Sequence, residues 1–251
     1  MSDGIKPWLR IGYISPHPLI DTLPYEFYLM APTGVMMTAS CLEIADYTLE
    51  AVENQLAVLD CRIDALVKRG AQRIVISGVP VAVALGRQRM QSLLDRLQAR
   101  WQLPCDTDLE AIIAGVKASG AVTVGLATRW HGQMNEALTA YLAEASVEVV
   151  SLANSPRSMM ENAGLDDETG IALAMDLGEQ AITADSSPDA LIIPGGRWIT
   201  AGVIPILESR FGKPVITNYS AGLWAALRAV GHHQPIKGWG MLLSRLGPGH
   251  A

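Results

Sequence analysis

The stretch RIVISGVPVAVALG, residues 73–86, has the same pattern as the stretch ALIIPGGRWITAG, residues 190–202, in the second half of the chain. Each is a short run of apolar and β-branched residues that ends in a glycine turn, at Gly78 and at Gly195. Such a run predicts a buried strand, and the turn predicts a connection from that strand to a helix. The match between the two stretches indicates that the chain consists of two related halves.

Two more pairs of segments recur in the same order. RIGYISP at residues 10–16 matches TVGLATR at residues 123–129. LPCDTDLEAIIAGVKASG at residues 103–120 matches KPVITNYSAGLWAALRAVG at residues 213–231, and both have the pattern of a strand, a polar turn and a helix that ends at glycine. Self-similarity on this scale predicts a duplicated structure, with the two copies related by a pseudo-twofold axis. A ligand cleft is then expected between the copies.

Short β-branched runs alternate with longer amphipathic stretches along the chain. The predicted strands cover residues 9–15, 73–77, 122–127, 147–152, 190–193 and 214–217. The predicted helices cover residues 47–69, 87–100, 108–118, 133–145, 168–184 and 221–229. This alternation predicts an α/β fold with a mostly parallel sheet, flanked by helices, in each of two lobes. We expect lobes at residues 1–119 and 120–231, and a C-terminal segment, residues 232–251, that packs back on the first lobe.

Composition and charge exclude several classes of partner. A chain of 251 residues with 49% hydrophobic residues suits one large domain or two intimate lobes. The net charge of −6, without a basic cluster, argues against nucleic acid and anionic membranes as partners. No apolar run approaches the roughly 20 residues that cross a bilayer, and the N-terminus lacks the pattern of a secretory signal. We therefore expect a cytoplasmic protein that binds a small molecule.

The sequence presents no signature of a cofactor or a metal site. Cys41, Cys61 and Cys105 are odd in number and widely spaced, which indicates reduced thiols rather than disulfides or a metal site. A zinc site needs a compact set of His, Cys and carboxylate ligands, and no such set is present. Neither a phosphate-binding P-loop nor a GxGxxG fingerprint follows a predicted strand. We expect no metal and no bound cofactor.

The candidate binding residues lie in the loops after the predicted strands, because parallel α/β sheets bind ligands at the carboxyl ends of their strands. Glycine turns present backbone N–H groups to anions, hydroxyls hydrogen-bond them, and arginines grip carboxylates. The same residue types also suit tight turns, helix caps and solvated loops, and only the two matched copies favour a ligand site. The predicted binding residues are Pro16, Gly78, Val79, Thr107, Arg129, Trp130, Pro194, Gly195, Gly196, Arg197, Asn218 and Ser220.

Four side chains are candidates for moving a proton. His17 and His131 follow the two matched strands that carry RIGYISP and TVGLATR, and histidine titrates near neutral pH. Asp106 and Tyr219 lie in the two matched polar turns. The segment 23–37, rich in Pro, Tyr and Met, is interpreted as a lid or as part of an interface.

A family resemblance rests on five blocks in a fixed order. These are IGYISP at 11–16, VISGVP at 75–80, GLATRW at 125–130, LIIPGG at 191–196 and KPVITNYSAGLWAALRAVG at 213–231. Together they resemble the aspartate/glutamate racemase superfamily, and in particular its branch of arylmalonate decarboxylase and maleate cis-trans isomerase. The resemblance implies an enzyme that acts at a carbon next to a carboxylate.

The resemblance also implies catalytic cysteines that this chain does not have at the matching places. Racemases of the family use one cysteine at a strand end of each half, and the decarboxylase keeps only the one in the second half. These places correspond here to the turn at residues 77–79 and to Pro194, which contain no thiol. Proline has neither a titratable group nor a backbone N–H, so the usual two-thiol chemistry is not expected.

Three functions remain open from the sequence. The first is an enzyme that makes or breaks a bond next to a carboxylate, as a decarboxylase- or hydratase-type lyase or as an isomerase. The second is a non-catalytic relative that binds a small carboxylate. The third is a hydrolase in which Asp106 or His131 activates water. The partner expected in each case is a small carboxylate or a related small molecule, and a homodimer is the expected assembly.

Overall fold

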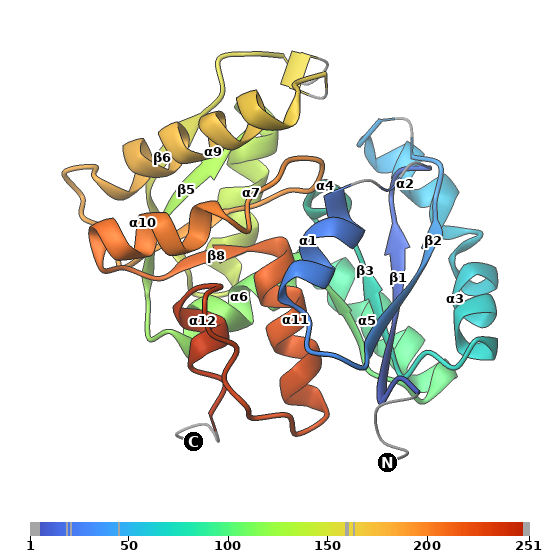
Figure 1. Ribbon diagram of the computed structural model, residues 1–251. Coiled ribbons are helices and arrows are strands. Elements are labelled where there is room, and N and C mark those ends of the chain that lie inside the picture. The colour runs from blue at the N-terminus through green and yellow to red at the C-terminus, as the bar shows by residue number, and fades with distance from the viewer. Residues whose placement is uncertain are drawn as a thin grey trace.

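The computed structural model describes residues 6–18, 20, 22–44, 46–158, 161–162 and 164–247. It contains two four-stranded parallel sheets flanked by helices, as predicted (Figure 1). The strands of the first sheet are β1 (Leu9–Ser15), β2 (Val35–Cys41), β3 (Arg73–Ile76) and β4 (Cys105–Thr107). Those of the second sheet are β5 (Thr123–Thr128), β6 (Glu148–Asn154), β7 (Ala190–Ile193) and β8 (Val215–Thr217).

Both sheets have the same strand order, β2-β1-β3-β4 in the first half and β6-β5-β7-β8 in the second. The three repeated segments of the sequence therefore occupy equivalent places, because β1 matches β5, β3 matches β7, and β4 matches β8. Gly12 and Gly125 occupy matched positions in β1 and β5, where a β-carbon would approach Ile74 Cδ1 at 2.8 Å and the Ala181 carbonyl oxygen at 2.9 Å. Glycine is needed at both positions because neighbouring elements pack so closely on these strands.

The helices cover the sheets and close each half. Their bounds are α1 (Thr22–Met30), α2 (Leu49–Leu56), α3 (Leu59–Lys68), α4 (Val79–Leu85), α5 (Arg87–Trp101), α6 (Asp108–Ala118), α7 (Gly132–Glu144), α9 (Asp167–Ile182), α10 (Val203–Phe211), α11 (Asn218–Ala229) and α12 (Met241–Ser244). Among the described residues, no helix is long and apolar enough to cross a bilayer.

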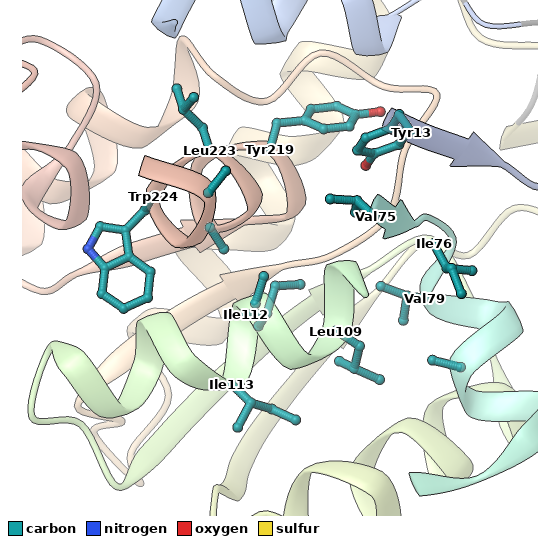
Figure 2. Packing of buried hydrophobic residues seen from close by; sticks show 14 of the residues in the cluster. Tyr13, Val75, Ile76, Val79, Leu109, Ile112, Ile113, Tyr219, Leu223 and Trp224 are labelled. Carbon is teal, nitrogen blue, oxygen red and sulfur yellow. The ribbon is translucent and has the colours of Figure 1, made fainter. Parts of the chain in front are cut away.

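Helices α6 and α11, the matched last helices of the two halves, pack against each other and join the halves. Leu109 and Ile112 of α6 are fully buried, as is Leu223 of α11, and they belong to one hydrophobic cluster (Figure 2). Helix α11 also packs on α1, almost two hundred residues earlier in the chain (Figure 1). The first residues of α6 and α11 are thereby brought together at the junction of the halves.

The segment 23–37, interpreted from the sequence as a lid or as part of an interface, forms most of α1 and the start of β2. Leu23, Phe27 and Met30 of α1 are buried in the core of the first half. The predicted helix at residues 47–69 is two helices, α2 and α3, separated by Ala57 and Val58.

The C-terminal segment contacts both halves rather than the first alone. The ring of His232 stacks on Trp8 of the first half, with ring centroids 5.2 Å apart. The Met241 N–H donates to Glu208 Oε2 of α10 at 2.7 Å, and α12 packs on α11 and β8. Its described part, residues 232–247, therefore ties the halves together.

Candidate active site

The centre of the junction is the carboxyl group of Asp108, the first residue of α6. This side chain is 1% exposed and accepts four hydrogen bonds. Tyr13 Oη donates to Oδ1 at 2.6 Å, Ser77 Oγ donates to Oδ2 at 2.6 Å, and the Gly78 N–H donates to Oδ2 at 3.0 Å. The fourth donor, Asn218 Nδ2, lies 3.2 Å from Oδ2. Burial raises the pKa of Asp108, and these hydrogen bonds oppose that rise.

Asp108 and Asn218 are matched residues of the two halves, and together they connect the two glycine turns. Each follows a threonine that caps its helix, Thr107 before Asp108 and Thr217 before Asn218. Asp108 accepts from the Gly78 N–H, and Asn218 Oδ1 accepts from the Gly195 N–H at 2.8 Å. These two N–H groups, which were predicted to face a ligand, both donate to side chains of the protein in this structure.

Two tyrosines lie beside this network. Tyr13 from β1 and Tyr219 from α11 line a small apolar pocket, together with Leu23 and Phe27 of α1 (Figure 2). Burial, and then the charge of Asp108, raise the pKa of Tyr13, so its hydroxyl stays a hydrogen-bond donor at neutral pH. A β-carbon at Gly196 would approach Tyr219 Oη at 2.7 Å, which places that hydroxyl against the second glycine turn.

A second polar group lies where β1 ends. His17 Nε2 is 2.7 Å from Tyr47 Oη, and the two rings meet edge to face. Burial raises the pKa of Tyr47 to about 12, while the positive charge of Arg197 acts in the opposite direction. Arg197 follows the second glycine turn, and its N–H donates to Thr22 Oγ1 of α1 at 3.2 Å. Residues of both halves thus meet in this group.

The loop after β7 is held in place by Arg129. Its guanidinium donates to the carbonyl oxygens of Gly196 and Arg197, and it lies over the ring of Trp198 at 4.7 Å from the centroid. The ring of Trp130 lies against Gly195, where a β-carbon would approach it at 3.1 Å. Arg129 and Trp130, both predicted as ligand contacts, therefore shape the loop that carries the second glycine turn.

Helix α1 binds the same loop through Glu26, a fully buried carboxyl. Its Oε1 accepts from the Thr200 N–H at 2.6 Å and from the Ala201 N–H. Its Oε2 is buried and has no hydrogen-bond partner among the described residues. Burial raises the pKa of Glu26 from 4.5 to about 7, against the effect of these hydrogen bonds. Glu26 thus fixes the loop after β7 to the first half.

The sequence and the fold of this chain are similar to those of known proteins. The family model described as arylmalonate decarboxylase matches residues 11–243, which is most of the chain. The chain belongs to the arylmalonate decarboxylase family.

Individual relatives match this chain over nearly their whole length. The arylmalonate decarboxylase of Bordetella bronchiseptica is 29% identical over 224 residues, which cover 88% of this chain and 90% of that protein. The structure of unliganded arylmalonate decarboxylase superposes with a TM-score of 0.79 at 26% identity, covering 94% of this chain and 98% of that one. Maleate isomerase from Pseudomonas putida S16 shares the fold, with a TM-score of 0.82 at 22% identity over 95% of this chain and 99% of the other.

In this member of the family, Asp106 does not lie in the central network. Its Oδ2 forms an ion pair with Arg73 at 2.6 Å, and its Oδ1 accepts from the Thr107 N–H. Burial raises the pKa of Asp106, and the charge of Arg73 opposes that rise. Asp106, which was predicted to move a proton, is thus engaged with Arg73, whereas Asp108, two residues further along the chain, lies in the central network.

His131 has protein partners at both ring nitrogens. Its Nε2 lies within hydrogen-bond distance of the Arg157 carbonyl oxygen, and its Nδ1 is 3.2 Å from Asn154 Nδ2. These contacts join the end of β5 to the edge strand β6. Both ring nitrogens of His131, predicted to move a proton, are thus engaged by backbone and side-chain groups of the protein.

Two predicted hydroxyl ligands are used as helix caps. Thr107 Oγ1 accepts from the Glu110 N–H at 3.1 Å. Ser220 Oγ accepts from the Thr217 N–H at 3.1 Å and so completes a capping box at the start of α11. Both hydroxyls, which were predicted to contact a substrate, are buried and bound within the protein in this structure.

The remaining predicted binding residues are apolar supports of the turns. Pro16 is buried against the first turn, since a β-carbon at Gly78 would approach its ring at 2.9 Å. Val79 and Pro194 are also buried, beside Gly78 and Gly195. Among the described residues, no group of three or more His, Cys, Asp or Glu side chains is placed to hold a metal ion.

Four residues of the candidate site were not among those predicted from the sequence, namely Asp108, Tyr13, Tyr47 and Glu26. One signal for Asp108 was present, because aligning LPCDTDLEA with KPVITNYSA pairs Asp108 with Asn218, each directly after a threonine. Tyr47 and Glu26 had no comparable signal. They come to the junction through long-range contacts that a single sequence does not display.

Proposed function

We propose that this protein is a cofactor-independent enzyme that makes or breaks a bond next to the carboxylate of a small acid. Decarboxylase-type lyase activity is the first choice within this class, and hydratase-type lyase or isomerase activity is the alternative. One observation carries the proposal. His17, Tyr47 and Arg197 meet beside the two glycine turns that Asp108 and Asn218 connect.

The group of His17, Tyr47 and Arg197 is suited to hold a carboxylate. Arginine supplies a permanent positive charge and paired N–H donors that match carboxylate geometry. Tyr47, whose pKa is about 12, keeps its hydroxyl proton at neutral pH and can donate it in a hydrogen bond. His17 orients this hydroxyl through the 2.7 Å contact. A substrate carboxylate bound here places its neighbouring carbon at the glycine turns.

Charge on the substrate oxygens grows as the bond next to the carboxylate breaks, because the electrons move into an enediolate. Hydrogen-bond donors and a cation that are already in place stabilise such charge without reorganising, and each donor contributes about 3 to 4 kcal/mol in known enzymes. Membership of the arylmalonate decarboxylase family favours loss of carbon dioxide as the source of the enediolate. The proposal requires no thiol at residues 77–79 or 194.

The test is turnover of a panel of substituted malonates, hydroxy acids and enoates, followed by proton NMR in D₂O. The proposal expects a product with deuterium at the carbon next to the carboxylate. Replacing Arg197 with alanine should raise KM at least tenfold, and Tyr47→Phe should raise it less. Arg89→Ala, which removes an exposed arginine paired with Glu53 on the surface, is the matched control and should change neither constant.

Two results would redirect the assignment. Saturable binding of malonates with no turnover or deuterium exchange would indicate a non-catalytic carboxylate-binding relative. Hydrolysis of cyclic amides, lost in Asp106→Ala or His131→Ala, would indicate the hydrolase that the sequence analysis left open.

A further inference from the structure

We infer that Ser77 carries the proton in this site and that Asp108 supplies that proton from behind it. The inference rests on the proposed function and names the group that exchanges the proton with the reacting carbon. It concerns the same junction, but a different pair of residues from the carboxylate-holding group.

The position of Ser77 suits a proton carrier. It directly follows β3, at the start of the first glycine turn, and is half-buried, whereas Asp108 behind it is fully buried. Ser77 Oγ and Asp108 Oδ2 are 2.6 Å apart, a distance typical of a strong hydrogen bond to a carboxyl group. Of the four partners of Asp108, Ser77 is therefore the hydroxyl placed nearest to the outside.

The other partners of Asp108 leave its proton one outward route. The Gly78 N–H and Asn218 Nδ2 only donate, so neither can accept a proton from the carboxyl group. Tyr13 Oη is hydrogen-bonded to Asp108 Oδ1 and is itself a hydroxyl, but the Tyr13 side chain is buried and borders the apolar pocket. Among the described partners of Asp108, Ser77 Oγ is the hydroxyl that is not fully buried, and it is therefore the outward route for a proton on Asp108.

Asp108 has no cationic partner among its described hydrogen-bond donors, unlike a carboxyl group in an ion pair. Its four partners are neutral, whereas Asp106 is paired with the Arg73 guanidinium. Burial without a cation favours the protonated form of Asp108, and the four donors stabilise the anion once the proton has left. Such a group can both release and take back a proton.

For a malonate-type substrate, the reaction consists of decarboxylation followed by protonation of the enediolate carbon. The bond between the central carbon and one carboxylate breaks, carbon dioxide leaves, and the electron pair enters an enediolate. The protonation step starts from protonated Asp108, with the hydroxyl of Ser77 rotated away from its orientation in the structure so that Asp108 Oδ2 donates to Ser77 Oγ. The carbon then takes the proton of Ser77 Oγ, while Oγ takes the proton of Asp108, so that one C–H bond forms and Asp108 becomes an anion. Water returns one proton to Asp108 through Ser77 before the next turnover.

The test uses Ser77→Ala, Ser77→Cys and Asp108→Asn in the full-length protein. Ser77→Ala should lower kcat about 10²- to 10³-fold and leave KM within about threefold, because general acid catalysis contributes this much. Ser77→Cys should recover part of kcat, since a thiol also carries a proton. Asp108→Asn should lower kcat similarly and remove the high-pH fall of activity that deprotonation of Asp108 causes in the wild type. Ser92→Ala, which removes an exposed hydroxyl of α5 bound to the Gln88 carbonyl, should behave like the wild type.

The kinetics of the wild type and of these variants support or refute the proton relay from Asp108 through Ser77. If the wild type turns over a substrate and Ser77→Ala keeps kcat within about threefold, the relay is wrong while the proposed function stands. If Asp108→Asn folds and retains the high-pH fall, Asp108 is not the source of the proton. Should Asp108→Asn not fold, the loss in Ser77→Ala and the recovery in Ser77→Cys decide alone. Absence of turnover by the wild type on the whole panel would overturn both the function and the relay.

Discussion

At the scale of residues, two buried carboxyl groups without a cationic partner among the described residues lie at the junction of the halves. Glu26 and Asp108 are both fully buried, and both contact only neutral hydrogen-bond donors. Taking a carboxylate out of water without a cation is unfavourable, so each retains its proton at a higher pH than an exposed carboxyl group does. Glu26 makes this effect measurable, because it lies outside the proposed reaction.

Replacing Glu26 with glutamine should make the protein less sensitive to pH. The folded pKa of about 7 lies above the ordinary value of 4.5, so the stabilisation is complete below pH 4.5 and is lost as pH rises to about 7. A difference of this size corresponds to about 3 kcal/mol. Urea denaturation at pH 5 and pH 8 should show the wild type losing stability relative to Glu26→Gln. An unchanged difference between the two proteins would contradict the buried carboxyl described here.

Gly196→Ala tests the close approach of Tyr219 to the second glycine turn. The new β-carbon would lie 2.7 Å from Tyr219 Oη, so the ring or the loop must move. We expect a loss of about 1 to 3 kcal/mol in the free energy of unfolding, as for other overpacked sites. Gly202→Ala, in the same loop with nothing within 4 Å of the added carbon, is the control and should be close to wild type. Equal stability of the two variants would refute the contact.

The helix predicted at residues 108–118 has the bounds of α6, but the sequence did not indicate what the two neighbouring carboxyl groups contact. Strand β4 ends at Thr107, so Asp106 lies in the sheet beside Arg73 and Asp108 begins the helix. The ion pair of Asp106 with Arg73 and the hydrogen bonds of Asp108 are long-range contacts, which the segment LPCDTDLEA alone does not display. The repeat placed the glycine turns correctly because their positions depend on local backbone geometry.

At the scale of elements, the clearest strands in the sequence are buried ones, although the edge strand β6, whose residues are mostly half-buried or exposed, was also predicted. β3 and β7 are almost wholly apolar and buried, and a short apolar run of this kind is readily identified as a strand in the sequence. β2 is an edge strand with mostly half-buried residues, and its sequence VMMTASC does not alternate, so it was missed. Helix α1 was also missed, because TLPYEFYLM contains a proline and lacks a clear apolar face.

The cap of α11 should contribute to stability as well as to the site. Thr217 Oγ1 accepts from the Ser220 N–H, and Ser220 Oγ returns a hydrogen bond to the Thr217 N–H. Thr217→Ala should lower the free energy of unfolding by about 1 to 2 kcal/mol, and Thr217→Ser should recover most of the loss. Chemical denaturation measures both, and equal stabilities of the alanine and serine variants would show that the hydroxyl does not cap the helix.

At the scale of the whole molecule, the two halves share one core through α6 and α11. The main hydrophobic cluster contains residues of both halves, including Ile14 of β1 and Leu126 of β5. The Asp108–Asn218 contact and the binding of Glu26 to the loop after β7 add polar links between the halves. We therefore expect the halves to unfold together rather than separately.

Ile112→Ala in α6 tests this cooperativity. The side chain is fully buried at the packing surface with α11, so its loss should cost about 2 to 5 kcal/mol. Calorimetry should show a single transition at a lower Tm for the variant, as for the wild type. Two separate transitions in either protein would mean that the halves are independent domains.

A substrate carboxylate is expected to bind between the halves with its neighbouring carbon at the first glycine turn. A crystal structure with malonate tests this binding mode most directly. One carboxylate should lie within hydrogen-bond distance of Tyr47 Oη and the Arg197 guanidinium, and the central carbon should lie next to Ser77 Oγ. Malonate bound at another place, with Tyr47, Arg197 and Ser77 untouched, would contradict this binding mode.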